Sequence, residues 1–364
     1  MYTKSDKVIL WLSQFNFVTD SIIEKFIEKF NNLGDMFDNI LDYREKLSKF
    51  LQKSDVDELY NNLNIHTIDR LLSEYEKQGI TIVTLISDLY PETLRNIDKP
   101  PIVLYCKGDI GLLKSEALGV VGTRRATKYG KDTTNKLVTQ VASTGITIVS
   151  GLAEGIDTIA HKSTLEVKGK TIAVLGGGFG NIYPNINQPL AEQIIKDGGL
   201  LLSEYKPSEP SLTYHFPIRN RIIAGLCKAV LIVEATEKSG SMHTKNFAIE
   251  YGKEVFAVPG RLGDIYSEGC NKIIANGQAR MVLSTQDILQ FFEKEDKNHT
   301  SLNVVQLTCD EQMIYDSLVG HEKHFDELAS ELKIDAKTLA TMLMRLEIKG
   351  IISKLPGNFY KLCN

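Results

Sequence analysis

The chain has 364 residues, with 42 Lys and Arg side chains against 46 Asp and Glu, so its formal net charge is −4. Its hydrophobic fraction of 43% and charged fraction of 24% are typical of globular proteins and exclude a mostly disordered chain. No apolar run approaches the roughly 18–20 residues that span a bilayer, and the five scattered cysteines form no CxxC pair, which argues against a disulfide framework or a zinc site. We expect two or three domains, reduced thiols and a cytoplasmic location.

Residues 1–85 are predicted to form a small helical domain. Apolar side chains recur there at the spacing of amphipathic helices. They are Ile22, Ile23, Phe26, Ile27 and Phe30 in one stretch, and Leu59, Leu63, Ile68, Leu71 and Leu72 in another. The pairs Tyr90-Pro91 and Pro100-Pro101 then predict an irregular, extended connection to the next unit.

Residues 86–292 alternate short β-branched runs with amphipathic stretches. Strands are predicted at Leu118–Val121, Thr147–Ser150, Thr171–Leu175, Leu200–Ser203, Val230–Glu234 and Val255–Val258. Helices are expected between most of them, at about 131–143, 156–167, 188–197, 218–226 and 242–251. Near-continuous apolar strands joined by helices indicate a parallel sheet that is covered on both faces. The pattern predicts an α/β fold with a Rossmann-like, doubly wound and mostly parallel sheet.

The last part of the chain is predicted to form a separate small domain. Residues 293–303 are polar and predict a linker. Within 304–364 the pattern indicates two helices joined by a turn and then a hairpin, at 325–332, 337–349 and 351–362. This order of elements predicts a winged-helix domain.

Several strand-to-helix loops combine glycine with hydroxyl or basic side chains. They contain Gly122, Thr123, Arg124 and Arg125, then Ser150 and Gly151, then the run 176–180, and finally Ser239, Gly240, Ser241, Thr244 and Lys245. Glycine lets a phosphate approach the backbone, and Ser and Thr hydroxyls add hydrogen-bond donors. Because the carboxyl ends of parallel strands meet at one edge, beside helix N-termini with free N–H groups, these loops predict an anion-binding rim.

The distribution of charge also favours an anionic ligand. The net charge of −4, taken alone, argues against a nucleic-acid partner. However, residues 81–300 carry a net +2 between flanks of −4 and −2. Cations concentrate there in two stretches, with Arg124, Arg125, Lys128 and Lys131 in the first and Lys206, Arg219, Arg221 and Lys228 in the second.

The second stretch interleaves aromatic rings with arginines. Residues 214–221 contain Phe216, Arg219, Asn220 and Arg221. Cations that follow phosphates, beside rings that stack on exposed bases, suit single-stranded nucleic acid. The alternative is that Phe216 belongs to the core and Arg219 caps a neighbouring element.

Known catalytic and nucleotide-binding signatures do not fit the chain. The run 176–180 is followed by Asn181 where GxGxxG requires its third glycine. His161, one turn after Asp157 on a predicted helix, is expected to be structural because no nucleophile is supplied to it. The residues therefore predict a binding protein with no catalytic residue, metal or cofactor.

Over about residues 88–290 the sequence resembles the DNA-processing protein A family (DprA, also called Smf). The motifs that carry the resemblance are, in chain order, YPETLRNIDKPPIVLYCKG, GVVGTRRATKYG, SGLAEGIDTIAH, GKTIAVLGGGFGNIYP, SEY, FPIRNRIIAGL, VEATEKSGSMHT, VFAVPG and EGCNKIIANG. The resemblance implies a non-enzymatic, cytosolic homodimer. It would bind single-stranded DNA, load the RecA recombinase onto it and protect incoming DNA during natural transformation. A SAM-like helical domain before this region and a winged helix after it also fit the family's architecture.

The resemblance also implies roles for particular residues. With the loop pattern, it places the DNA-binding set at Gly122, Thr123, Arg124, Arg125, Ser150, Gly151, Lys206, Phe216, Arg219, Asn220, Arg221, Ser239, Gly240, Ser241, Thr244 and Lys245. Segment 269–282, including Ile273, Ile274 and Met281, would form the dimer surface, with the RecA contact nearby. Two positions depart from the family's pattern. Glu154 replaces a frequent arginine, and Lys245-Asn246 replaces small residues.

Two other interpretations stay open. One is a nucleotide-binding protein or an enzyme on a related Rossmann-like fold, the lysine-decarboxylase-like phosphoribohydrolases of nucleoside monophosphates, whose PGGxGTxxE loop resembles residues 239–244. Phe247 replaces the glutamate of that loop, which argues against the hydrolase chemistry. The other makes the winged helix the main DNA reader. Its net charge of −2, with only Lys337 and Arg345 flanking the recognition helix, argues against strong duplex binding.

Overall fold

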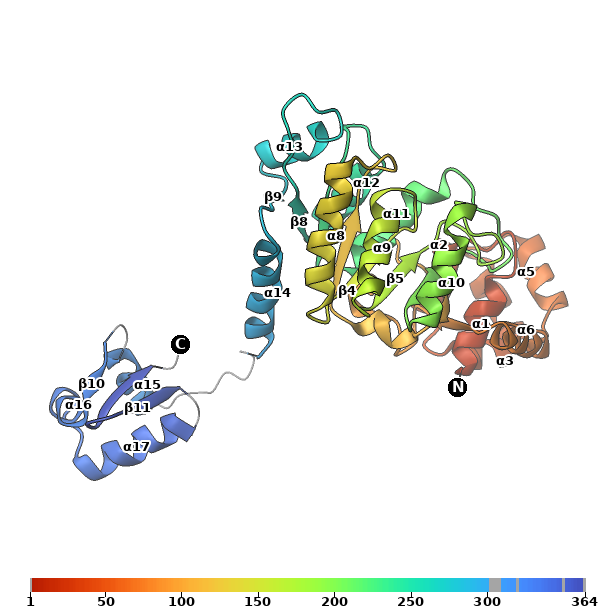
Figure 1. Cartoon of the computed structure of the whole chain (residues 1–364). Coiled ribbons are helices and arrows are strands. Elements are labelled where there is room, and N and C mark those ends of the chain that lie inside the picture. The colour runs from red at the N-terminus through yellow and green to blue at the C-terminus, as the bar shows by residue number, and fades with distance from the viewer. Residues whose placement is uncertain (1, 301–308, 319–320, 349–350, 363–364) are drawn as a thin grey trace. The chain divides into compact units, whose positions relative to one another are not determined.

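The computed structural model describes residues 2–300, 309–318, 321–348 and 351–362. The chain divides into two compact units, Met1–Gln290 and Phe291–Asn364, whose elements are labelled in Figure 1. Among the described residues, no helix combines the length and the apolar character needed to cross a membrane.

The first unit contains a nine-stranded sheet in the order β1-β2-β6-β5-β4-β3-β7-β8-β9. The strands are β1 (Ile80–Thr84), β2 (Val103–Gly108), β3 (Ala117–Val121), β4 (Thr147–Ser150), β5 (Thr171–Val174), β6 (Leu200–Ser203), β7 (Ala229–Ile232), β8 (Glu254–Ala257) and β9 (Arg280–Met281). The seven neighbouring strands β6, β5, β4, β3, β7, β8 and β9 are parallel to one another. Strands β1 and β2 form an antiparallel edge beside β6. The predicted mostly parallel, doubly wound sheet is confirmed.

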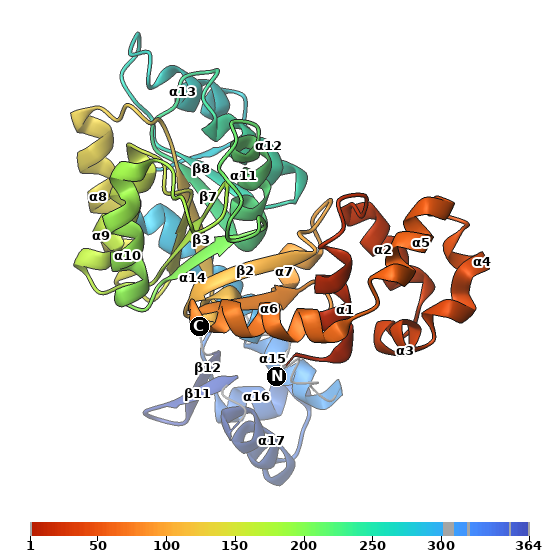
Figure 2. The ribbon, with the colours of Figure 1, turned by 90° about the vertical axis from the view of Figure 1, so that its right-hand side faces the viewer.

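Helices cover both faces of this sheet. The helices along this part of the chain are α7 (Glu92–Arg95), α8 (Lys128–Ala142), α9 (Ile156–Glu166), α10 (Gln188–Lys196), α11 (His215–Leu226), α12 (Ser241–Glu250) and α13 (Glu268–Ala275). A further helix, α14 (Thr285–Thr300), continues past the end of the first unit. Figure 2 shows α8, α9 and α10 on one face and α11 and α12 on the other. After β6 the chain returns through α11 to the far side of β3, so the strand order reverses between β3 and β7. In such sheets ligands bind beyond the carboxyl ends of the strands at this reversal.

The N-terminal helices pack against the antiparallel edge of the sheet. They are α1 (Lys4–Leu12), α2 (Asp20–Lys29), α3 (Leu33–Asp38), α4 (Arg44–Leu47), α5 (Lys53–Asn61) and α6 (Ile65–Lys77). Their apolar faces share one core with Ile80, Ile82 and Tyr105 of β1 and β2. Each helix buries an amphipathic face, as the periodicity predicted, but the core that they build is continuous with the edge of the sheet.

The structure adds elements that the sequence analysis did not predict. Strand β1 lies inside the predicted helical domain, and α7 and β2 lie in or just after the predicted extended connection. Residues 293–300 of the predicted linker continue helix α14, while 301–303 lie outside the described residues. The sequence of residues 293–300 contains neither glycine nor proline. Because no helix-breaking residue is present, the helix continues through this polar segment.

The second unit has the predicted winged-helix arrangement. It contains α15 (Cys309–Ser317), β10 (Lys323–His324), α16 (Phe325–Leu332), α17 (Ala336–Ile348), β11 (Ile352–Leu355) and β12 (Phe359–Leu362). The strands form a small antiparallel sheet in the order β10-β12-β11. Lys333, in the left-handed conformation at φ 54°, ends α16 and turns the chain toward α17. Leu328, Leu343 and Ile352 are among the residues that form the core of this unit.

Candidate nucleic-acid interface

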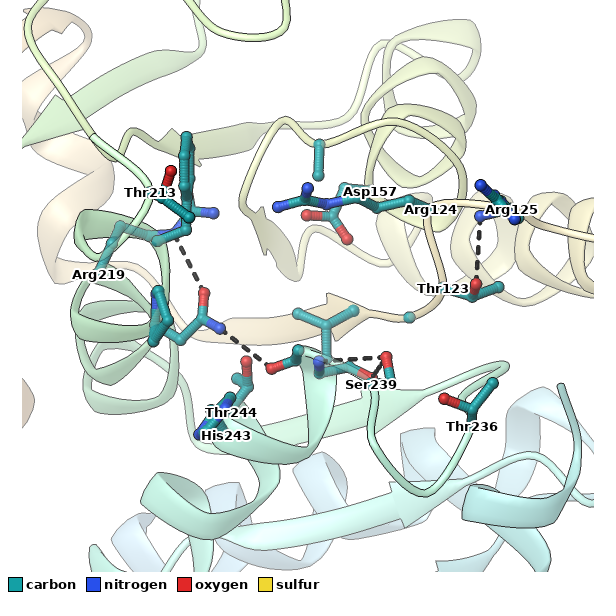
Figure 3. A pocket seen from close by; sticks show the side chains of 18 of the residues that line it. Thr123, Arg124, Arg125, Asp157, Thr213, Arg219, Thr236, Ser239, His243 and Thr244 are labelled. Carbon is teal, nitrogen blue, oxygen red and sulfur yellow. Dashed lines mark hydrogen bonds between the residues drawn. The ribbon is translucent and has the colours of Figure 1, made fainter. Parts of the chain in front are cut away.

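A cavity of about 640 Å³ opens beyond the carboxyl ends of β3 and β7, where the strand order reverses. Figure 3 shows that its labelled side chains come from the loops after β3 and β7, from the segment before α11, and from α9, α11 and α12. Of the predicted set, the lining contains Gly122, Thr123, Arg124, Arg125, Phe216, Arg219, Asn220, Ser239, Gly240, Ser241 and Thr244. Eleven of the sixteen predicted residues therefore lie around this one cavity.

Two exposed arginines supply positive charge to this cavity. Arg124 and Arg125 lie in the loop between β3 and α8. The Arg124 guanidinium stands 5.7 Å from the centre of the Phe216 ring, and the Arg125 backbone N–H donates to Thr123 Oγ1 at 3.1 Å. Within the described part of the chain, neither guanidinium forms an ion pair with a carboxylate. Their charge is therefore available to an anionic ligand.

The N-terminus of α12 supplies neutral donors on the opposite wall. Ser239 and Ser241 place their hydroxyl oxygens 2.8 Å apart. The Thr244 side chain is fully buried, and its Oγ1 has no hydrogen-bond partner among the described residues. A buried hydroxyl without a partner is costly. Since this one lies in the first turn of a helix whose N–H groups favour anions, a phosphate oxygen would satisfy it.

Aromatic rings form a third wall. Phe216 packs so closely over Gly176 that a Cβ at that glycine would lie 2.8 Å from the ring. Tyr183 is 53% exposed and lies 5.5 Å from Phe216 between ring centres. An exposed ring beside a fixed ring suits stacking on a base. Sequence reasoning missed Tyr183, although its position just after the glycine run 176–180 was a signal that could have identified it.

Arg219 lines the cavity, but its Nη1 and Nε groups donate within the fold. The side chain is 4% exposed, and Nη1 donates to the carbonyl oxygens of Gly151, at 2.9 Å, and of Val174. Its Nε donates to Asn220 Oδ1 at 3.2 Å. Burial lowers the pKa of Arg219 to about 10, and the Asp157 carboxylate opposes that shift. The capping role left open by the sequence therefore describes this residue better than contact with DNA.

Five other predicted DNA-binding residues do not line this cavity. They are Ser150, Gly151, Lys206, Arg221 and Lys245. Ser150 Oγ donates to the Val120 carbonyl at 2.6 Å, and Lys245 Nζ lies 3.5 Å from Gln278 Oε1.

The ion pair of Arg221 explains why it points elsewhere. It pairs with Glu204 at 2.6 Å, and both side chains are about 10% exposed. Residues two apart on a helix differ by about 200° around its axis, so Arg219 and Arg221 must face opposite sides of α11.

The predicted dimer residues separate in a similar way. Ile273 is 4% exposed and packs into the core of the first unit, and Ile274 is half-buried against the same core. Met281 is 44% exposed and lies near Leu283, which is 74% exposed. Of the three predicted residues, Met281 is the most exposed.

Comparison with known proteins identifies the class to which this fold and site belong. Residues 81–293 match the model of the DNA recombination-mediator protein A family, and residues 303–358 match that of the DprA winged helix domain. The chain is 42% identical to DNA processing protein DprA of Bacillus subtilis over 71% of this chain and 84% of the relative. It is 36% identical to Protein Smf of Escherichia coli over 81% of each chain.

Solved structures agree with this assignment. DNA processing protein A of Streptococcus pneumoniae superposes with a TM-score of 0.61 and 36% identity, covering 79% of this chain and 98% of that one. The protein from Helicobacter pylori, whose structure is described as revealing a single-stranded DNA binding mode, gives a TM-score of 0.54 and 34% identity over 59% of this chain and 96% of that one. The chain belongs to the DNA-processing protein A (DprA/Smf) family.

Proposed function

We propose that this protein binds single-stranded DNA in the cavity beyond β3 and β7. We further propose that it loads the RecA recombinase onto that strand and protects incoming DNA during natural transformation, in the cytoplasm and without catalysis. The observation that carries the proposal is one cavity that combines exposed guanidinium groups, a helix N-terminus with an unpartnered hydroxyl, and an exposed aromatic ring. The description of the H. pylori relative supports the same ligand.

The walls of the cavity suit the parts of a nucleotide. The N-terminus of α12, with Ser239, Ser241 and Thr244, would receive a phosphate, because N–H and O–H donors converge there. Arg124 and Arg125 would neutralise the backbone, and Tyr183 with Phe216 would stack on a base. None of these contacts depends on base identity, so binding is expected to be independent of sequence.

The salt dependence of binding tests this proposal. Each phosphate that a cation neutralises on a single strand contributes about −0.7 to the slope of log affinity against log salt. With Arg124 and Arg125 in the cavity, we expect a slope of about −1.4 for each cavity and weaker binding of duplex DNA of the same length. A titration of both DNAs between low and moderate salt measures this. An affinity that ignores salt, or equal affinity for duplex, contradicts the proposal.

We propose that the protein is a homodimer that uses the surface around Met281. That side chain is a large exposed apolar group beside the exposed Leu283. Replacing it by glutamate would bury a charge in the interface, so Met281→Glu is expected to sediment as a monomer. Met313→Glu is the control, because Met313 is similarly exposed at 47% in the winged-helix unit. A Met281→Glu protein that remains dimeric contradicts this interface.

The absence of catalysis is tested with nucleoside monophosphates. The related hydrolases rely on a glutamate at the position of Phe247, and a phenylalanine ring cannot accept a proton. We expect no release of ribose phosphate during prolonged incubation. Release at a rate that scales with protein concentration would support the enzymatic alternative instead.

A further inference from the structure

The loop that carries Arg124 and Arg125 is held at both ends by a single buried residue. Glu234 follows β7 and is 1% exposed. Its backbone carbonyl accepts from the Thr123 N–H at 2.7 Å. Its carboxylate accepts from the Thr127 N–H at 3.0 Å and from the Thr127 hydroxyl at 2.5 Å. Both arginines lie between these two anchor points.

The Glu234 carboxylate also lies at the N-terminus of α8, a position where Rossmann-like folds commonly bind the anionic group of a ligand. Thr127 is the N-cap of α8, the helix that follows β3 beside the reversal of strand order, and the N-terminus of that helix favours an anion. A Cβ at Gly130, in the first turn, would lie 2.1 Å from Glu234 Oε2. The chain's own carboxylate therefore fills the anion site of α8, and the N-terminus of α12 is left for the phosphate.

A neighbouring loop supports the same segment from its other side. The Thr123 carbonyl accepts from the Ile156 N–H at 3.2 Å. Gly155, at φ +79°, is so close that a Cβ there would lie 2.3 Å from the Thr123 carbonyl oxygen and 2.7 Å from the Arg124 carbonyl carbon. With the backbone supported in this way, the freedom of the loop is confined to the two exposed arginine side chains.

We propose that Glu234 is a positioning residue for single-stranded DNA recognition, which acts by fixing the loop that presents Arg124 and Arg125. This inference rests on the proposed function. Electrostatics alone would predict that removing Glu234 raises the affinity for DNA, because a negative charge near an anion site opposes DNA binding. The proposed positioning role predicts that the affinity falls. If Glu234 acted only through its charge, its removal would tighten binding. If it acts by holding the loop, breaking the bonds to Thr127 weakens binding.

Thr127→Val is the most direct test, because it removes the hydroxyl donor and keeps both the shape of the side chain and the Glu234 charge. The variant loses the hydroxyl bond to Glu234 and also the N-cap bond that the Thr127 hydroxyl accepts from the Gly130 N–H at 3.2 Å. The poorer orientation of the arginines is expected to weaken single-stranded DNA binding about fivefold to tenfold. The slope against log salt should move toward zero by up to about 0.7, the contribution of one phosphate contact. Thr127→Ser keeps the hydroxyl and should restore wild-type affinity and slope. Glu234→Ala removes both bonds between the carboxylate and Thr127, leaves the Gly130 cap bond in place, and should also weaken binding.

The Arg124→Ala/Arg125→Ala background separates positioning from general damage to the fold. In that background Thr127→Val should cause no further loss of affinity, because the groups that it misplaces are gone. An equal further loss there, or tighter binding by either Thr127→Val or Glu234→Ala, overturns the proposed positioning role. If the wild-type protein itself fails to bind single-stranded DNA, the proposed function fails, whereas wild-type binding that Thr127→Val leaves unchanged rejects the positioning role alone.

Discussion

Arg124→Ala is expected to weaken binding of single-stranded DNA about tenfold or more, because the variant loses one charge-assisted hydrogen bond to the ligand. The side chain is exposed, lines the cavity and lies over the Phe216 ring, so its removal takes away both a phosphate contact and one side of the base-stacking wall. The slope of log affinity against log salt should fall in magnitude by about 0.7. Binding titrations with strands of different base composition should show the same loss for each.

Lys131→Ala is the matched control for this prediction. Lys131 is an exposed cation of the same basic stretch, but it lies on α8 and does not line the cavity. Its removal changes the net charge by the same amount and should alter affinity by less than about twofold, since a distant surface charge is screened by salt. Equal losses for Arg124→Ala and Lys131→Ala would mean that general charge, and not this cavity, attracts the strand.

Arg219→Ala is expected to destabilise the fold by more than about 2 kcal/mol, because each buried carbonyl oxygen left without its donor costs about 1–3 kcal/mol. The variant leaves the carbonyl oxygens of Gly151 and Val174 without their donor and leaves buried Asp157 without its cationic neighbour. Urea unfolding of the variant and the wild type measures the difference. Arg124→Ala should change stability by less than about 0.5 kcal/mol, because its side chain is exposed. An Arg219→Ala protein of normal stability and reduced DNA affinity would instead assign Arg219 a direct contact with DNA.

The pH dependence of the Arg219→Ala variant follows from Asp157. Burial raises the pKa of that carboxyl, and the Arg219 guanidinium opposes the shift, so its loss raises the pKa further. A carboxyl whose pKa is raised by folding holds its proton more tightly in the native state than in the unfolded state. Its contribution to stability is therefore fully present below the ordinary carboxyl pKa near 4 and is lost as pH rises through the native value. The free energy of unfolding of the variant should fall with pH over a wider range than that of the wild type.

The sequence alone predicted the architecture well where local pattern controls structure. The predicted strands of the parallel sheet and the helices between them are present with small shifts at their ends, because buried parallel strands are near-continuous apolar runs. Strands β1 and β2 were missed since they form an antiparallel edge, whose register depends on partners elsewhere in the chain. The two-residue strand β9 is too short to leave a pattern.

The sequence predicted which loops form the candidate site, but it did not predict which of their side chains face the cavity. The sequence correctly brought the loops after β3 and β7 to one edge, and the cavity lies between them. It did not reveal Tyr183, nor that Lys206 and Lys245 lie outside the cavity lining. Composition shows that a cation is present in a segment, whereas packing decides what it faces.

The sequence by itself determined the family, the doubly wound sheet and the glycine-rich, basic loops at its carboxyl edge, because these depend on the order and spacing of residues along the chain. Only the tertiary structure decided which cations remain available to DNA. Arg219 donates hydrogen bonds to carbonyl oxygens at the ends of two strands, and Arg221 forms an ion pair with Glu204. Arg124 and Arg125, in contrast, are exposed. Their loop is in turn held by Glu234, 107 residues away from Thr127. Buried polar groups must find partners wherever the fold brings them, and those partners lie far apart in the sequence.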